Sequence, residues 1–203
     1  MVLLLLTGCA GKQSIAFEGG NTFSFDIETF KLDDITFTLN EGGKKTTIPL
    51  SKNHLTDEDF LKLLSVGTHE LKITHDNMTL DVVITLTGQT PADYDVMLYS
   101  LKEGDKYVFY TMGTYVSYEL HLAQSTNKEG NISNETEGIF DGGYKDGYLA
   151  VIHSFGKAVS THQKVFSVSY DKDVSQTFTL EKMIFYRFDE TLFEIKNVIY
   201  YQR

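Results

Sequence analysis

Apolar and polar side chains alternate along most of this chain, in short runs that end at turn residues. Phe23, Phe25 and Ile27 form one such run, and residues 80–86 form another. Alternation with a period of two places successive side chains on opposite faces of a β-strand. No long run with helical spacing accompanies these patterns. We therefore expect an all-β fold built as two consecutive β-sandwich domains.

The first domain combines strand patterns with one short helical segment. Residues 51–64 have helical spacing, and Thr56 followed by Asp59 is an N-cap pattern at its start. Apolar residues alternate on both sides of the pair Asp76-Asn77, which predicts a β-hairpin. The expected order is therefore strands, a short helical crossover and a hairpin.

Residues 21–88 resemble a bacterial immunoglobulin-like domain. The resemblance rests on the stretch TFTLNEGGKKTTIPLSKNHLTDEDFLKLLSVGTHELKITHDNMTLDVVITL. It implies a β-sandwich of the kind that serves as a spacer or adhesive unit in surface proteins. The Cys-Trp-Cys pattern of antibody domains is missing, so the similarity is to the bacterial variety.

A linker at residues 89–92 separates this domain from a second β-sandwich at residues 93–203. In one strand of this second domain we expect inward-pointing side chains at Val116, Tyr118, Leu120 and Leu122. The outward-pointing side chains are expected at Tyr115, Ser117, Glu119 and His121. Residues 124–137 are polar and predict a long loop. The segments DGYLAVIHSFG and KVFSVSYD resemble cohesin-type or carbohydrate-binding modules, a similarity that assigns a role to no single residue.

The chain begins with an apolar run that ends in Leu6-Thr7-Gly8-Cys9. This motif resembles the bacterial lipobox, which implies a signal at residues 1–9, a diacylglyceryl group on Cys9 and a tether at residues 10–20. No basic residue precedes Lys12, so we expect a truncated signal peptide. The predicted location is the extracytoplasmic face of a bacterial cell membrane, held through the lipid on Cys9. The alternative is a chance apolar start with a buried structural cysteine.

The charge and motif content exclude several classes of protein. The formal net charge is −10 without any basic cluster, and phosphate binding needs such clusters, so nucleic acid is not expected as a partner. No nucleophile motif, phosphate-binding loop or paired-histidine motif is present. We expect a protein without catalytic activity and without a required cofactor.

Two loop features are candidates for binding. Asp141 and Asp146 lie five residues apart in a Gly-rich stretch, where their carboxylates could hold a calcium ion; a plain turn is the alternative. Tyr144 and Tyr148 flank the same stretch and are the candidate ligand contacts, because a tyrosine ring offers apolar area and a polar hydroxyl. The alternative for these rings is filling of the sandwich core.

These observations predict a cell-surface lipoprotein that acts as a non-catalytic binding or adhesion module for a glycan or protein ligand. Two alternatives stay open. One is a structural or assembly lipoprotein that docks an envelope partner through strand edges. The other is an accessory domain of a glycan-degrading system.

Overall fold

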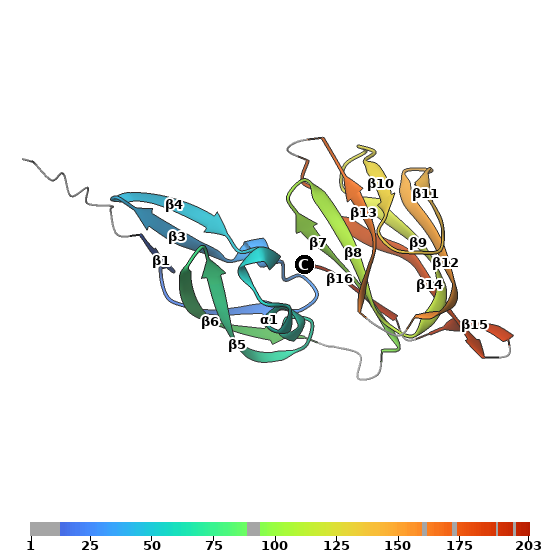
Figure 1. Cartoon of the computed structure of the whole chain (residues 1–203), viewed down its shortest axis with the longest axis horizontal. Helices are drawn as coiled ribbons and strands as arrows, with labels where there is room; N and C mark the ends of the chain where they lie inside the picture. Colours follow the sequence, from blue (N-terminus) through green and yellow to red (C-terminus); the bar gives the residue numbers. More distant parts are fainter. Residues whose placement is uncertain (1–12, 89–93, 160–161, 172–173, 190, 197) are drawn as a thin grey trace, which may run out of the picture. The chain divides into compact units, whose positions relative to one another are not determined.

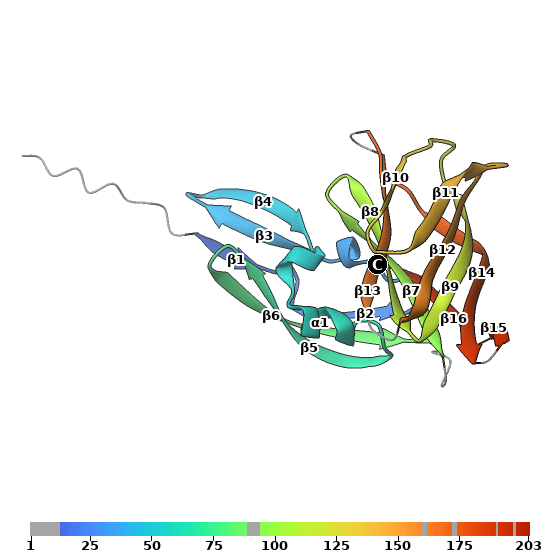
Figure 2. The same cartoon turned by 45° about the vertical axis from the view of Figure 1, so that its right-hand side comes forward.

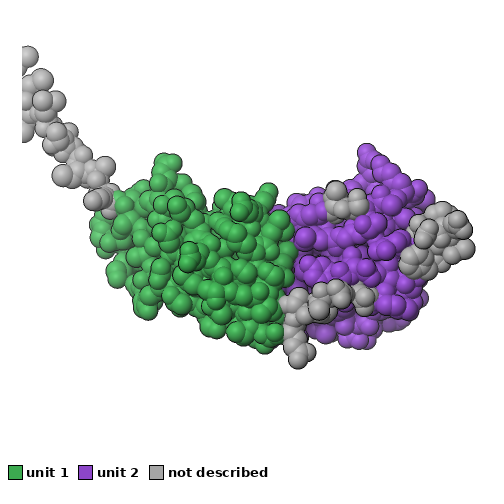
Figure 3. Space-filling model, turned by 90° about the horizontal axis from the view of Figure 1, so that it is seen from below, with its two compact units in different colours: residues 1–27, 31–88 green, residues 28–30, 89–203 purple. Residues whose placement is uncertain are grey.

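The computed structural model describes residues 13–88, 94–159, 162–171, 174–189, 191–196 and 198–203. The chain divides into two compact units, one of residues 1–27 and 31–88 and one of residues 28–30 and 89–203 (Figure 3). Both units are built from β-sheets, which confirms the expected all-β fold. In the part of the chain described, no helix has the length and apolar character needed to span a membrane. Cys9 and the predicted linker 89–92 lie outside the described residues.

The first unit contains two three-stranded sheets (Figures 1 and 2). One sheet, in the order β1-β3-β4, consists of β1 (Ser14–Ala16), β3 (Thr36–Glu41) and β4 (Lys44–Pro49). The other, in the order β2-β6-β5, consists of β2 (Thr22–Asp26), β6 (Met78–Thr87) and β5 (Gly67–His75). β2 pairs with β6 in parallel, and the other pairs are antiparallel.

Alternating apolar residues supply the core of this unit, as the sequence pattern predicts. The fully buried side chains come from both sheets and from the segments joining them, and they include Ile27, Ile35, Phe37, Ile73 and Ile84. The β5–β6 hairpin is also confirmed, with Asp76 in the left-handed region at φ 51°. Asp and Asn tolerate that conformation because their short side chains bond locally.

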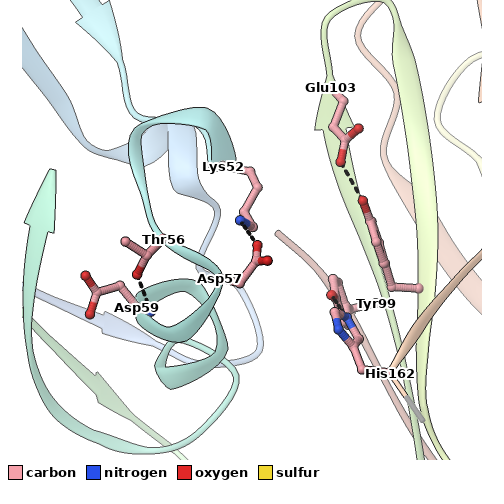
Figure 4. Close-up of polar contacts among 8 residues, drawn as sticks. Lys52, Thr56, Asp57, Asp59, Tyr99, Glu103 and His162 are labelled. Atoms are coloured by element: carbon pink, nitrogen blue, oxygen red, sulfur yellow. Dashed lines mark hydrogen bonds and ion pairs between the residues drawn. The ribbon is translucent and has the colours of Figure 1, made fainter. Parts of the chain in front are cut away.

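Short helical turns lie before β3 and between β4 and β5. The 3-10 helix η1 (Leu32–Asp34) precedes β3, whereas the 3-10 helix η2 (Lys52–His54) and the α-helix α1 (Asp57–Lys62) connect β4 to β5. The predicted N-cap is confirmed, since Thr56 Oγ1 accepts a hydrogen bond from the Asp59 backbone N–H at 3.1 Å (Figure 4). Lys52 Nζ lies 2.5 Å from Asp57 Oδ1 and fastens η2 to the first turn of α1.

The described part of the predicted tether belongs to the fold. Ser14–Ala16 form β1, which pairs antiparallel with β3 from Ser14↔Asn40 to Ala16↔Thr38. Phe17 then packs edge to face on Phe23, with ring centroids 5.2 Å apart. The tether was expected because this stretch is short and polar, but β3 offers it an edge whose backbone groups need partners.

The second unit contains two five-stranded sheets that face each other across one core (Figure 1). The first sheet, in the order β10-β13-β8-β7-β16, consists of β10 (Asn131–Asn134), β13 (Gln163–Ser169), β8 (Lys106–Gly113), β7 (Val96–Glu103) and β16 (Val198–Gln202). The second, in the order β11-β12-β9-β14-β15, consists of β11 (Ile139–Lys145), β12 (Tyr148–Val159), β9 (Tyr115–Gln124), β14 (Phe178–Asp189) and β15 (Thr191–Ile195). β16 joins β7 in parallel.

Aromatic rings fill the space between these two sheets. Phe109 and Phe166 stack with centroids 4.2 Å apart, and Phe178 meets the ring of Phe109 edge-on at 5.2 Å. Tyr115 packs edge-on against Phe185 at 4.9 Å. Such pairs add to the stabilisation from area burial, since offset and edge-to-face geometries suit the ring quadrupole.

Strand β9 corrects one expectation about side-chain direction. Tyr118, Leu120 and Leu122 face the core as predicted, but Tyr115 is fully buried and Val116 only half-buried. The break lies beside a register shift in the neighbouring ladder, where β12 pairs up to Ser154↔Ser117 and resumes only at Val159↔Tyr115. The extra residues of this bulge belong to β12, and regular pairing between the two strands ends there.

The predicted loop and turn regions also contain strands. Residues 131–134, within the predicted loop, form the strand β10. This strand pairs with β13, and Ile132 lies opposite Val168 and Asn134 opposite Phe166. The Gly-rich stretch around Gly142 and Gly143 forms β11 and pairs along its whole length with β12. Glycine does not prevent a strand where the neighbouring strand supplies the pairing.

We predict that Gly113→Ala destabilises the protein much more than Gly104→Ala. Both glycines have positive φ, 131° at Gly113 and 66° at Gly104. A Cβ added at Gly113 would lie 2.3 Å from the Asp95 carbonyl oxygen, whereas a Cβ added at Gly104 would have no neighbouring atom within 4 Å. Backbone strain costs about 1 kcal/mol at Gly104, whose φ is in the left-handed region, and more at Gly113, whose φ suits almost only glycine. Overpacking adds about 2 kcal/mol at Gly113. Urea unfolding measures both losses; equal losses would contradict the expected clash.

Candidate binding surface

The β11–β12 hairpin divides its side chains between the core and the outer face of its sheet. The pairs Phe140↔His153, Gly142↔Val151 and Tyr144↔Leu149 point inward, as their burial shows. The intervening pairs point outward, which leaves eight residues on the outside of the hairpin. We call this set the hairpin face: Ile139, Asp141, Gly143, Lys145, Tyr148, Ala150, Ile152 and Ser154.

The hairpin face carries an unusual share of exposed apolar side chains. Ile139 is 80% exposed, Ile152 is 52% exposed and Tyr148 is 38% exposed. Across the described part of the chain, the large hydrophobic residues found exposed are these three together with Val66 and Tyr94. Single exposed hydrophobic residues are ordinary, so the notable feature is that three of them share one face of one hairpin.

Charged residues border the apolar part of this face on β9 and β14. Glu119, which pairs across from Ile152, lies 2.6 Å from Lys182 Nζ and 3.1 Å from His121 Nε2. The hydrogen bond from Lys182 lowers the pKa of Glu119 against the opposing effect of desolvation, so the carboxyl is ionised. The apolar residues therefore have a charged and hydrogen-bonded rim beside them.

The two candidate tyrosines lie on opposite faces of the sheet. Tyr148 belongs to the hairpin face, while Tyr144 packs against the core and its hydroxyl accepts a hydrogen bond from the Gly130 backbone N–H at 2.7 Å. Residues 144 and 148 stand on paired strands, and Tyr144↔Leu149 and Lys145↔Tyr148 are neighbouring pairs that point to opposite faces. Tyr148 thus remains available for contact, whereas Tyr144 has a structural position.

The two candidate calcium ligands are far apart. Asp141 stands in the middle of β11 opposite Ile152, and Asp146 lies in the tight turn that joins β11 to β12, at φ 51°. The four steps of strand from Asp141 to Lys145 alone cover about 13 Å at the usual rise per residue. In the part of the chain that the structure describes, no three His, Cys, Asp or Glu side chains are grouped to hold a metal ion.

His153 is fully buried in the second unit and does not pair with its neighbour Ser154. Its Nε2 lies 3.1 Å from the Glu137 carbonyl oxygen, so that nitrogen donates, and Nδ1 accepts from the Tyr118 hydroxyl at 3.3 Å. Burial lowers the pKa of His153, although the hydrogen bond to Glu137 opposes the shift. The imidazole is therefore a neutral part of the core, and Ser154 faces outward.

A second polar and aromatic cluster lies on the other sheet of this unit. The rings of Tyr99, Tyr110 and His162 stack with centroids 5.0 to 5.7 Å apart, and the Tyr99 hydroxyl contacts His162 Nε2 (Figure 4). The Tyr110 hydroxyl donates to Glu103 at 2.7 Å, and Lys164 lies 3.6 Å from the same carboxylate. These contacts connect β7, β8 and the start of β13. The polar atoms in them are bonded to one another, so the cluster has a structural role.

Asp59 of the first unit does not provide a protonated acid for glycoside hydrolysis. A shallow groove there is lined by Asp59, Glu70, Lys72 and Asp81 among others. Burial raises the pKa of Asp59, but hydrogen bonds from Lys62 and the Lys72 backbone outweigh this effect and lower it overall. A glycosidase needs one carboxyl that stays protonated, which requires a raised pKa.

Ile139 and Ile152 are the surface residues that the sequence analysis missed. Ile139 follows a polar stretch and precedes two glycines, so it was not assigned to a strand. The signal was present in the alternation of residues 139–145, in which Phe140, Gly142 and Tyr144 share the inward face.

Comparison with known proteins yields one structural similarity. No protein-family model and no curated protein matches this chain. A non-cellulosomal cohesin from the hyperthermophilic archaeon Archaeoglobus fulgidus superimposes with a TM-score of 0.42 at 14% sequence identity. The similarity covers 54% of this chain and 91% of the cohesin.

We predict that Tyr144→Phe and Tyr148→Phe separate the two tyrosines by role. Loss of the Tyr144 hydroxyl leaves the half-buried Gly130 N–H without its acceptor, which should cost about 1–2 kcal/mol in the free energy of unfolding. Loss of the exposed Tyr148 hydroxyl should change it by less than about 0.5 kcal/mol. Urea denaturation followed by near-UV circular dichroism measures both. Equal effects would contradict the placement of the rings.

Proposed function

We propose that this protein is a non-catalytic binding module that docks a protein partner on the hairpin face. The observation that carries the proposal is the exposure of Ile139, Tyr148 and Ile152 on one side of a rigid hairpin. When a partner covers an exposed hydrophobic side chain, the complex is stabilised by about 25 cal/mol per Å² of apolar area removed from water. A surface formed by strands rather than loops also loses little entropy on binding.

The chemistry of this face favours a protein over a glycan. Two of the three exposed residues are isoleucines, which offer no flat ring for a sugar to stack on and no hydrogen bond. A buried apolar centre beside ionised side chains such as Glu119 and Lys182 has the usual composition of a protein–protein interface. Glycan binding is the competing outcome and would depend on Tyr148.

The location of the module is a second part of the proposal. We propose that Cys9 carries a lipid that holds the protein on the extracytoplasmic face of a bacterial cell membrane, with the first unit as an immunoglobulin-like spacer. The lipobox-like sequence Leu6-Thr7-Gly8-Cys9 supports this. On that membrane, a partner in the envelope would make the protein an assembly factor, and a partner outside the cell would make it an adhesin.

Site-specific photo-crosslinking tests the docking face. A photoreactive amino acid at position 139 or 152, in the full chain produced in its own cells, should give one discrete protein adduct. The same amino acid at Asn131, an exposed residue of β10 in the other sheet, should not. Adding Ile152→Asp should reduce the adduct from position 139 at least tenfold, because the partner would then bury an unpaired charge.

The matched control for this loss is Asn131→Asp, which adds the same charge on β10. It should leave the adduct from position 139 unchanged. Equal adduct yields from positions 131, 139 and 152 would overturn the docking face. Binding to glycans that is lost in Tyr148→Ala but kept in Ile152→Asp would replace the protein partner with a glycan.

The lipid on Cys9 has its own test. When the protein is expressed from its natural locus in cells fed an alkyne-bearing fatty acid, the wild type should carry the label and enter the detergent phase on extraction. Cys9→Ser should lose both properties, because the thiol is the attachment point. Label retained in Cys9→Ser, or absent from the wild type, would remove the lipoprotein part of the proposal without affecting the docking face.

A further inference from the structure

Two histidines of the first unit come together from elements 21 residues apart. His54 ends η2 and His75 ends β5, and the distance from His54 Nε2 to His75 Nδ1 is 3.3 Å. The ring centroids lie 5.4 Å apart, and both rings pack edge-on against Phe37, at 5.1 and 5.6 Å. The buried Phe37 ring thus holds the two imidazoles in place while each remains half-buried.

Hydrogen bonds fix which nitrogens of this pair face each other. The Ser51 backbone N–H donates to His54 Nδ1 at 3.0 Å, so the proton of neutral His54 is on Nε2 and points at His75 Nδ1. The other nitrogen of His75 faces Asp76, with Oδ2 3.8 Å away. One proton therefore occupies the space between two imidazole nitrogens that are both partly open to solvent.

We infer that this pair is a binding site for a divalent transition metal, with copper(II) the preferred ion and zinc(II) and nickel(II) weaker ones. Copper(II) prefers a tetragonal arrangement with adjacent nitrogens about 2.8 Å apart, whereas zinc(II), with bonds of about 2.0–2.1 Å at a tetrahedral angle, holds two imidazole nitrogens about 3.3 Å apart. His54 Nε2 and His75 Nδ1 already have this separation. The metal takes the place of the shared proton after a small rotation of the rings.

The surroundings of His54 allow the proton shift that metal binding needs. With a metal on Nε2, the proton of neutral His54 moves to Nδ1, where Ser51 Oγ lies 3.0 Å away and accepts it. Burial and the neighbouring His75 lower the pKa of His54, which favours the neutral ring that binds metals. The Ser51 N–H loses its acceptor in the exchange, so we expect a dissociation constant in the micromolar range rather than a tighter one.

The site has two protein ligands, and water completes the coordination. Among the described residues no third His, Cys, Asp or Glu is grouped with the pair. Imidazole ligands favour copper, nickel and zinc over magnesium and calcium, and copper(II) binds most strongly in that series. The site is separate from the hairpin face, so its failure leaves the proposed docking function untouched.

Copper(II) titration of the full chain tests the site. The chain should carry Cys9→Ser so that the thiol takes no metal, and should have no histidine tag. Calorimetry should give one site per chain, and electron paramagnetic resonance should show hyperfine coupling from two nitrogens. His54→Gln and His75→Gln should each weaken binding at least tenfold, while the matched control His69→Gln, which changes a histidine of the same unit, should not.

A second measurement uses the chain in which His54 and His75 are both intact, so its result does not depend on whether the histidine variants fold. In the nuclear magnetic resonance spectrum, small amounts of copper(II) should broaden the ring signals of His54 and His75 before those of His121, whose Nε2 lies 3.1 Å from Glu119. Copper(II) should also raise the melting temperature by several degrees, because it links η2 to β5 in the folded state only. Coupling to a single nitrogen, equal broadening of all histidines, or binding unchanged in both variants would overturn the site.

Discussion

The second unit depends on hydrogen bonds that allow polar rings to lie inside an apolar layer. The Tyr107 hydroxyl accepts from the Gln176 backbone N–H at 2.6 Å, and the Tyr115 hydroxyl contacts Thr111 and accepts from Gln163 at 3.1 Å. Each of these bonds joins residues of different strands or loops. An unmet hydroxyl in this layer would cost about 1–3 kcal/mol. The rings can therefore supply large apolar areas to the core only because the backbone and side chains around them are placed to satisfy their polar atoms.

Much of the fold follows from the alternation of side chains, and the exceptions have identifiable causes. β7 was not recognised because all residues from Val96 to Leu101 are buried, so that run shows no alternation. The apolar runs TFTL and MIFYRF have the patterns of two short strands, but both belong to the single strand β14, whose register with β9 shifts between Leu180 and Lys182. Parallel pairing of β16 with β7 leaves no local trace in the sequence, since it depends on long-range contacts alone. Patterns of two residues predict strands, but they predict neither their partners nor their bulges.

The candidate site shows the same division between local and long-range information. Aromatic residues near glycines suggested Tyr144 and Tyr148 together, yet pairing with β12 sends one ring inward and leaves the other outside. Whether a given residue faces inward or outward is set by the register of the ladder, and a shift of one residue would exchange the faces. The extended backbone of β11 separates Asp141 from Asp146, and the register brings Ile139 and Ile152 onto one side. Residue type could identify the hairpin, but only the ladder could identify its exposed side.

The buried polar residue His153 and the exposed apolar residue Ile152 differ in whether their surroundings match their chemistry. His153 is a buried polar group with a partner for each ring nitrogen, and such groups stabilise a core. Ile152 is the reverse, an apolar side chain held in water by a strand whose other face is committed to the core. His54 and His75 lie between these cases, because each has protein contacts and each remains partly open to solvent, with His75 at 21% exposure. A group that is held in place but still accessible can exchange its proton for another cation. The pair belongs to the first unit, whereas the hairpin face belongs to the second.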